Sequence, residues 1–232
     1  MEDELPAPRT ERPPHDFESF TSYAAVMTEV VRERLGRLVE LALPSGARWH
    51  PTGFLILQLL EIRSFGLVRL HIWPARVRVA KPGHPMIHCH GFHLYSTVVA
   101  GTYSEVRYDV ARIAAASVAE PRALHGFKVE PPRPDNVDRL CEEPDWRYSV
   151  RQNGRRTRDE LGSVHTQEAG TYHSTAIPMW STCVTLAITG THVQGQEDHL
   201  VGRPGSFTID GGRPYVPPDR ATLLLRGAGF AR

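Results

Sequence analysis

The chain has 232 residues, of which 41% are hydrophobic and 23% are charged, and its formal net charge at pH 7 is +1. This length and composition are those of an ordinary soluble globular protein with one sizeable domain. The near-zero charge argues against nucleic acid and anionic membrane surfaces as partners, and the longest apolar run, residues 53–62, is too short to span a bilayer.

The cysteines and the N-terminal stretch predict the compartment. The three cysteines (Cys89, Cys141 and Cys183) are an odd number without paired spacing, which argues against a disulfide framework. The first residues are acidic and proline-rich, and they contain no apolar signal region. We therefore expect a cytoplasmic protein.

The N-terminal part of the chain predicts a tail followed by a helix. Residues 1–15 are rich in proline and charge, which predicts a disordered tail. From there, apolar residues recur at three- and four-residue intervals, the pattern of an amphipathic helix that Asp16 or Ser19 can cap. We expect this helical segment, residues 16–46, to pack on the domain formed by residues 47–232. One such helix cannot form a helix-turn-helix module.

The rest of the chain is a series of short apolar or alternating segments separated by turn residues, which predicts strands. The expected strands cover residues 54–63, 66–73, 76–80, 87–101, 103–110, 162–175, 182–190 and 220–229. The polar, proline-rich stretch 119–160 predicts a long connection with one hairpin at Asn153-Gly154. The pattern as a whole predicts a mainly β fold, an antiparallel barrel or sandwich with an N-terminal helical segment.

Four histidines lie within ten residues, namely His84, His88, His90 and His93. Residues two apart on a strand leave the same face, so His88 and His90 can converge on one ion. Cys89 between them is expected to point the other way and to pack as a small apolar group. His84 lies in the preceding turn, where we expect it to be exposed to solvent.

The spacing around these histidines resembles the first motif of the cupin superfamily. That motif runs Gly, five residues, His-x-His, three or four residues, Glu, six residues, Gly. This chain reads Gly83, four residues, His88-x-His90, three residues, Leu94, six residues, Gly101.

A second segment resembles the second cupin motif, which runs Gly, five residues, Pro-x-Gly, two residues, His, three residues, Asn. This chain reads Gly162, five residues, Glu168-x-Gly170, two residues, His173, three residues, Ile177. The resemblance implies a cupin-type antiparallel β-barrel, also called a double-stranded β-helix or jelly roll, with a metal ion inside. It also implies that His88, His90 and His173 are the metal ligands.

The chain departs from the cupin pattern at Leu94, where most metal-binding cupins place a carboxylate ligand. Leucine cannot coordinate a metal. Either the three histidines hold the ion alone, or His93 substitutes for the carboxylate, or this chain has lost its metal. On an unbroken strand His93 points away from the ion, but a bulge at Gly91 would turn it inward. We predict a catalytic or substrate-contacting role for His93.

Three neutral imidazoles suit iron(II), zinc, nickel, copper or manganese. A three-histidine site without the carboxylate is similar to that of the thiol dioxygenases, of which cysteine dioxygenase is the familiar case. This resemblance implies Fe(II) as the metal, with Zn, Ni, Cu and Mn as alternatives. It also implies that the site takes dioxygen and a small-molecule substrate, an amino or thiol acid.

Strand parity nominates residues that could contact the substrate. Arg69, His71 and Trp73 share one face of the strand expected at 66–73. If that face points into the barrel, Arg69 can bind a substrate carboxylate and His71 can act as an acid or base. If it points outward, Arg69 is a solvated surface charge. Further candidates for substrate binding are Tyr95, Tyr103 and Trp180.

Three functions are compatible with these patterns. The first is an iron(II)-dependent oxygenase or dioxygenase that acts on a small polar acid. The second is a metal-dependent lyase or isomerase, and the third is a non-catalytic cupin that binds a small ligand. Because cupins often pair through sheet edges, a homodimer is a further expectation.

Overall fold

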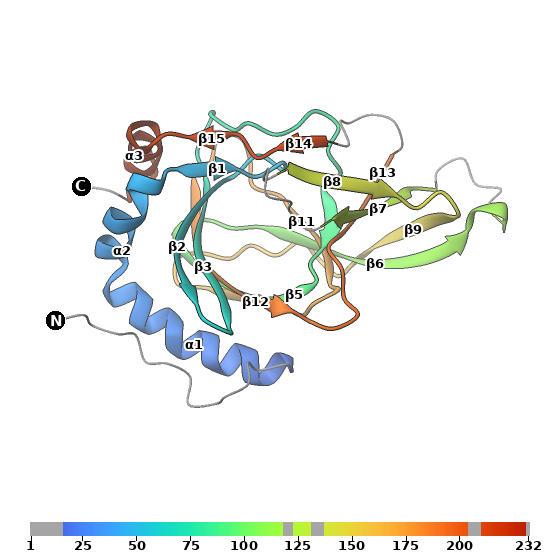
Figure 1. The fold of residues 1–232 in the computed structure, drawn as a ribbon, viewed down its shortest axis with the longest axis horizontal. Coiled ribbons are helices and arrows are strands. Elements are labelled where there is room, and N and C mark those ends of the chain that lie inside the picture. The colour runs from blue at the N-terminus through green and yellow to red at the C-terminus, as the bar shows by residue number, and fades with distance from the viewer. Residues whose placement is uncertain (1–15, 118–122, 131–136, 204–209, 231–232) are drawn as a thin grey trace.

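The computed structural model describes residues 16–117, 123–130, 137–203 and 210–230 (Figure 1). Within these residues the protein is mainly β, with two antiparallel sheets of seven and eight strands and two helices at its N-terminal end. One sheet is curled into a half-barrel (Figure 1). The predicted mainly β, antiparallel fold with an N-terminal helical segment is confirmed.

The chain crosses between the two sheets several times. In spatial order, the first sheet consists of β10 (Val164–Gln167), β5 (Phe92–Gly101), β12 (Cys183–His192), β3 (Gly66–Trp73), β2 (Leu55–Ile62), β1 (Ala47–Trp49) and β15 (Tyr215–Val216). The second consists of β14 (Asp210–Gly212), β8 (Val137–Glu142), β7 (His125–Glu130), β13 (His199–Gly202), β4 (Ile87–Cys89), β11 (Tyr172–Thr175), β6 (Glu105–Ala114) and β9 (Trp146–Asn153).

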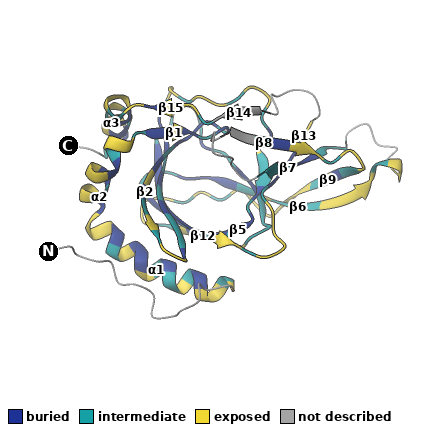
Figure 2. Ribbon diagram, viewed as in Figure 1, coloured by how far each residue is buried: buried dark blue, intermediate teal, exposed yellow. Residues whose placement is uncertain are grey.

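Helices cover the outer face of the first sheet (Figure 1). Helix α1 (Phe17–Glu33) begins after Asp16, whose carboxylate accepts a hydrogen bond of 2.8 Å from the Ser19 amide, so Asp16 and not Ser19 is the cap. The chain then breaks at Arg34 and continues as α2 (Leu35–Ala42). The buried side chains of both helices recur every three or four residues and face the sheet, while their other sides are exposed (Figure 2).

The two faces of the first sheet have different surroundings. Along β3, Leu70 and Ile72 are fully buried in the main hydrophobic core, which lies between this sheet and the helices. Arg69, His71 and Trp73 alternate with them and line a cavity on the other face, toward the second sheet. The main core is therefore outside the half-barrel, and the space within it holds polar side chains.

The last expected strand, residues 220–229, is instead helix α3 (Pro218–Gly227). Pro218 occupies the first turn, where the missing amide hydrogen costs nothing. Ala221 and Leu225 lie four residues apart and are buried in the main core. The strand prediction was wrong because a short apolar run fits either structure, and Pro218, a common first residue of a helix, is the signal that favours the helix.

Residues 119–160 are not the long connection that we expected. They contain β7, β8 and β9, of which β7 pairs with β8 and β9 pairs with β6. The predicted hairpin at Asn153-Gly154 is also wrong, because the chain leaves β9 for β10 in the other sheet. Most side chains of β9 are exposed or half-buried, so this strand lacks the apolar alternation that would reveal it.

The alternating stretch 76–80 is a loop, although a strand was predicted. Val77 and Val79 are exposed. The side chain of Arg78 holds this loop in place. Its guanidinium donates hydrogen bonds of 2.7–3.3 Å to the carbonyl oxygens of Pro74, Ile177, Pro178 and Ser181. The segment therefore joins two loops through an arginine side chain and not through backbone pairing.

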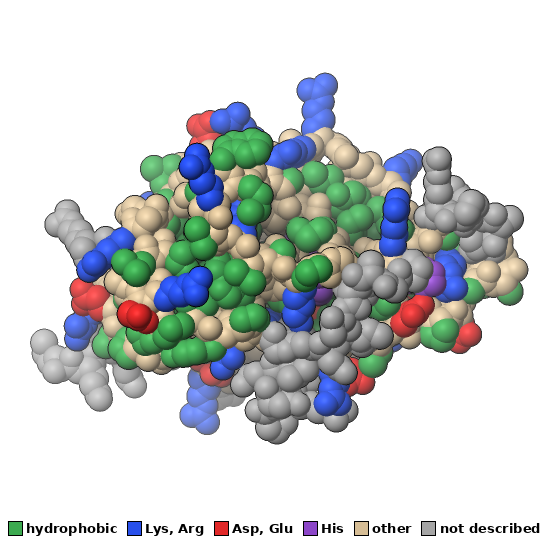
Figure 3. Space-filling view, turned by 90° about the horizontal axis from the view of Figure 1, so that it is seen from above, with side chains coloured by type: hydrophobic (Ala, Val, Ile, Leu, Met, Phe, Trp, Pro, Cys, Tyr) green, Lys and Arg blue, Asp and Glu red, His purple; other side chains and the backbone are tan. Residues whose placement is uncertain are grey.

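The surface seen from above carries Lys and Arg side chains scattered among hydrophobic ones (Figure 3). They do not gather into one basic patch on this face. None of the helices in the described part of the chain is both long and apolar enough to cross a membrane.

Candidate metal centre

Three histidines converge on one point in the second sheet. His88 lies on β4, His90 follows the end of that strand, and His173 lies on the adjacent strand β11. The register of the two strands sets His88 directly opposite His173. One nitrogen from each ring lies within 4.8 Å of the others, so the group could hold a metal ion. The His-x-His parity and the third histidine from a neighbouring strand follow the sequence prediction.

Each imidazole is oriented by an oxygen at its Nδ1 atom. The Met86 carbonyl oxygen lies 3.0 Å from Nδ1 of His88. A carboxylate oxygen of Asp198 lies 3.6 Å from Nδ1 of His90, and the Thr171 carbonyl oxygen lies 3.4 Å from Nδ1 of His173. An Nδ1–H that faces an oxygen leaves Nε2 as the nitrogen with a free lone pair. All three rings can therefore present Nε2 to the same point.

The electrostatics of the site suit metal binding. Burial, followed by the neighbouring histidines, lowers the pKa of His88 well below its ordinary value, and burial and His90 do the same for the pKa of His173. Both rings are therefore neutral at pH 7, which is the form that binds metal. Imidazole nitrogens suit iron(II), zinc, nickel, copper and manganese, so the donor set fits a divalent transition metal without selecting one.

Leu94 occupies the inward position that the cupin pattern gives to a carboxylate. It lies on β5, lines the cavity and is buried. Among the described residues, no acidic side chain joins the three histidines as a potential ligand. The group therefore supplies three neutral ligands and no negative charge of its own.

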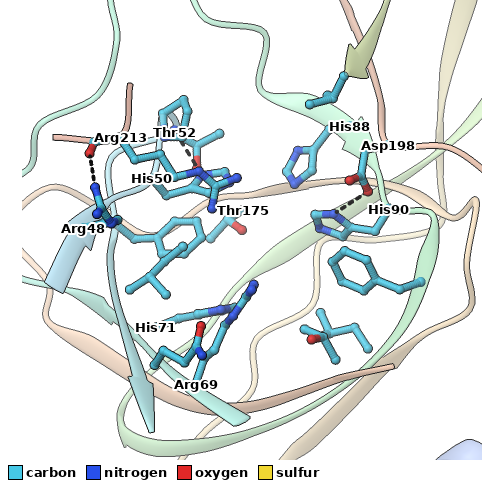
Figure 4. Close-up of a pocket in the computed structure, with 18 of the residues that line it drawn as sticks. Arg48, His50, Thr52, Arg69, His71, His88, His90, Thr175, Asp198 and Arg213 are labelled. Carbon is cyan, nitrogen blue, oxygen red and sulfur yellow. Dashed lines mark hydrogen bonds and ion pairs between the residues drawn. The ribbon is translucent and has the colours of Figure 1, made fainter. Parts of the chain in front are cut away.

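The histidines open into a cavity of about 1240 Å³ between the two sheets (Figure 4). Eight of the 12 histidines of the chain line it: His50, His71, His84, His88, His90, His165, His173 and His192. Aromatic and aliphatic side chains complete the walls, among them Phe54, Trp73 and Leu200. The cavity therefore combines a potential metal site with both polar and apolar surface.

Arg69 and His71 lie on the wall contributed by the first sheet (Figure 4). The Nε atom of Arg69 is buried without a hydrogen-bond partner, and its guanidinium forms no ion pair with any residue that the structure describes. Burial lowers the pKa of Arg69 to about 10, so it is a cation at pH 7. Burial, and next the charge of Arg69, lowers the pKa of His71 well below its ordinary value. The wall therefore carries a cation that forms no ion pair with a described residue, beside a neutral imidazole.

Tyr103 also lines the cavity, but its hydroxyl is engaged. It donates a hydrogen bond of 3.3 Å to the buried carboxylate of Glu105, and it lies 3.4 Å from the hydroxyl of Thr175. Its ring stacks on that of His165, with centroids 4.1 Å apart. The Glu105 carboxylate also accepts hydrogen bonds from Gln167 and Arg107.

Three residues predicted to act on or bind a substrate do not line the cavity, namely His93, Tyr95 and Trp180. His93 is buried on the opposite face of β5, where its ring packs between Phe17 and Phe20 of α1 and its Nδ1 accepts a hydrogen bond from the Ala169 amide. Gly91 is a bend between β4 and β5, which belong to different sheets, and it leaves the side chain of His93 on the outer face, against the helix. His93 is thus not placed to act in the cavity.

Tyr95 and Trp180 are the other two. Tyr95 packs against the main core beneath the helices, and Trp180 is 74% exposed. Neither faces the cavity, so neither is placed to bind a substrate there. Tyr172, next to His173 on β11, also points away from the ion site, and its hydroxyl lies 2.7 Å from Nδ1 of His199.

Sequence reasoning missed two polar residues of the site. His50 precedes β2 and lines the cavity; its ring stacks on Phe54, with centroids 4.3 Å apart, and lies 6.4 Å from the ring of His88. Asp198 lies between β12 and β13 and approaches His90. Both are single residues in turns, where no periodicity indicates the direction of a side chain.

Comparison with known proteins adds no relative: no family model matches the chain, and no curated protein matches it significantly.

Proposed function

We propose that the protein is a metal-dependent enzyme of the cupin type, a non-haem iron(II) oxygenase or dioxygenase that acts on a small organic acid. The observation that carries the proposal is the three-histidine group, whose ring nitrogens lie within 4.8 Å of one another at the wall of a cavity. Two further facts support the cupin type. The two motifs occur in the expected order, and their histidines lie on adjacent antiparallel strands facing a curled sheet.

The metal is assigned from the chemistry of its ligands. When bound, an iron(II) ion would supply open coordination positions and the electrons needed to activate dioxygen. His88, His90 and His173 would hold it through Nε2. Because all three are neutral, an anionic substrate group would complete the charge balance of the site.

Arg69 is the residue that we assign to the acid group of the substrate. Arg69 is half-buried and its Nε has no hydrogen-bond partner among the described residues, so a ligand that supplies a negative charge would offset the cost of removing this cation from water. A carboxylate matches the planar guanidinium in geometry as well as in charge. His71, two residues further along the same face, can hold or release a proton close to the bound acid.

Two other functions are tested by the same experiment. A metal-dependent lyase or isomerase would use the ion to polarise the substrate, with His71 moving the proton. A non-catalytic cupin would use the cavity only to bind a ligand, and the leucine in place of the usual carboxylate ligand favours this alternative over the lyase.

The test is the metal content of protein prepared without oxygen, compared among the wild type, His88→Gln, His173→Gln and the control His93→Gln. The control removes a buried imidazole outside the cavity and leaves an acceptor for the Ala169 amide. We expect a stoichiometric amount of iron in the wild type and in the control, and its loss from both other variants. Oxygen consumption with small acids and thiols then tests the reaction.

The outcomes separate the three functions. Iron together with substrate-dependent oxygen uptake would support the oxygenase. Metal without oxygen uptake on any acid or thiol would favour the lyase or isomerase. A wild type that stays free of metal, even after incubation with iron, zinc, nickel, copper and manganese, would overturn the proposal in favour of a ligand-binding module.

A further inference from the structure

A carboxylate lies directly behind one of the three histidines. Oδ1 of Asp198 is 3.6 Å from Nδ1 of His90 (Figure 4), which leaves Nε2 as the nitrogen of His90 that is free to join His88 and His173 at an ion. The same oxygen accepts a hydrogen bond of 2.8 Å from the Gly91 amide. The other oxygen, Oδ2, lies 3.4 Å from Nε2 of His192.

The sheet register explains this placement. Strands β4 and β13 are antiparallel, with Cys89 opposite His199 and His88 opposite Leu200. His90 is one residue after Cys89 and Asp198 is one residue before His199, so the same antiparallel register brings the two side by side. Asp198 lies just before β13, and its carbonyl oxygen accepts a hydrogen bond of 2.9 Å from the Val129 amide, which holds its backbone at the end of the paired strands.

The group behind His90 differs in charge from the groups behind the other two rings. Those groups are the backbone carbonyls of Met86 and Thr171, which are neutral. Asp198 is an anion, and a carboxylate that accepts the Nδ1 hydrogen fixes the tautomer of an imidazole and makes its other nitrogen a stronger donor to a metal.

We propose that Asp198 is a positioning residue of the metal centre: its carboxylate fixes His90 with Nε2 toward the ion, and it supplies, from behind a ligand, the negative charge that Leu94 cannot supply as a ligand. This inference rests on the proposed metal centre and adds a fourth residue to it. It also explains how a site of three neutral imidazoles can retain a divalent cation without a coordinating carboxylate.

A purely structural role is the competing explanation, since Asp198 also anchors the Gly91 amide. Asp198→Asn separates the two roles. Asparagine retains an oxygen for the Gly91 amide and has nearly the same shape, but it carries no charge. Glu197→Gln is the matched control, because it removes the same charge from the adjacent residue, whose carboxylate pairs with Lys128 at 2.7 Å and not with a histidine of the site.

The experiment measures the affinity of the metal-free full-length chain for Zn²⁺ and Co²⁺, by competition with a chelator. The absorption spectrum of the Co²⁺ form and the thermal midpoint of the metal-free form are recorded in parallel. We expect Asp198→Asn to weaken both affinities by about 10- to 100-fold and to change the Co²⁺ spectrum. The thermal midpoint should stay close to that of the wild type, and Glu197→Gln should keep the affinity of the wild type.

Two results would count against the inference, and they differ in what else they affect. Equal affinities and spectra for the wild type and Asp198→Asn would overturn the positioning role and leave the metal centre standing. A wild type that binds neither ion would remove the metal centre, and the role of Asp198 with it.

Discussion

At the scale of single residues, the most informative side chain is Arg69. It lies on the cavity wall, its Nε is buried without a partner, and it forms no ion pair with the described residues. Removing a cation from water costs several kcal/mol unless an opposite charge or hydrogen bonds compensate. A side chain with this cost and no structural benefit is expected where it serves a ligand.

Replacing Arg69 with methionine should therefore stabilise the ligand-free protein. Methionine has a similar length and no charge, so we expect the free energy of unfolding to rise by about 1–3 kcal/mol. Urea denaturation measures the change. Arg37→Met, on the exposed face of α2, is the control and should leave the stability nearly unchanged. A loss of stability in Arg69→Met would show that the guanidinium has a structural partner.

At the scale of elements, the direction of each side chain follows from strand parity once the inner face is known. Arg69, His71 and Trp73 alternate with Leu70 and Ile72 on β3, and the two sets face the cavity and the helices respectively. The same rule turns His93 away from the ion. The helices matter to the site because they cover the outer face of this sheet and so hold its inner face toward the second sheet.

The attachment of α1 depends on a specific cap. Asp16→Ala removes the acceptor for the Ser19 amide, and we expect it to lower the free energy of unfolding. Asp16→Asn retains an oxygen at that position and should cost much less. Thermal or urea unfolding of the two variants provides the measurement. Equal losses in both would mean that the charge of Asp16, and not its hydrogen bond, stabilises the helix.

At the scale of the whole molecule, the hydrophobic core and the site occupy different faces of one sheet. The main core fills the space between the first sheet and the helices, which frees the space between the sheets for a cavity of about 1240 Å³. Cavities that bind drug-sized ligands usually measure about 300–1,000 Å³. The site therefore has room for an organic acid considerably larger than a free amino acid, and screens for a substrate should include acids with an aromatic or aliphatic body.

The buried histidines make the stability of the whole protein depend on pH. Burial lowers the pKa values of His50, His71, His88 and His173 well below 6.5, whereas in the unfolded chain they return to about 6.5. As the pH falls through that value, the unfolded chain binds protons that the folded protein does not, so the free energy of unfolding decreases. His192, whose pKa is raised by its hydrogen bond to Asp198, acts in the opposite direction but is a single group.

We therefore expect the metal-free protein to lose stability between about pH 7.5 and pH 5.5, a window above the titration of unfolded carboxylates. Urea midpoints across this range measure the slope. The double variant His88→Gln/His173→Gln removes two of the four groups and should make the dependence of the midpoint on pH less steep. A midpoint that stays constant or rises on acidification would contradict the neutral, buried state of these rings.

The sequence by itself determined the mainly β class, the N-terminal helix with Asp16 as one of two candidate caps, and the placement of His88 and His90 on one face; the resemblance to the cupin motifs added His173. These follow from local rules: residues two apart share a strand face, apolar residues at helical spacing share a helix face, and a short polar side chain caps a helix. The same rules failed for residues 220–229 and for β9, where the pattern was ambiguous or absent because the segment is short or largely exposed.

Only the tertiary structure decided which face of β3 lines the cavity, that His93 packs under a helix, and that His50 and Asp198 join the site. Each of these depends on contacts between residues far apart in the chain: the helices cover one side of the first sheet, and β13 pairs with β4. Parity relates neighbours on one strand, but it cannot say which side of the strand is inside. That choice belongs to the packing of the sheets and helices against one another.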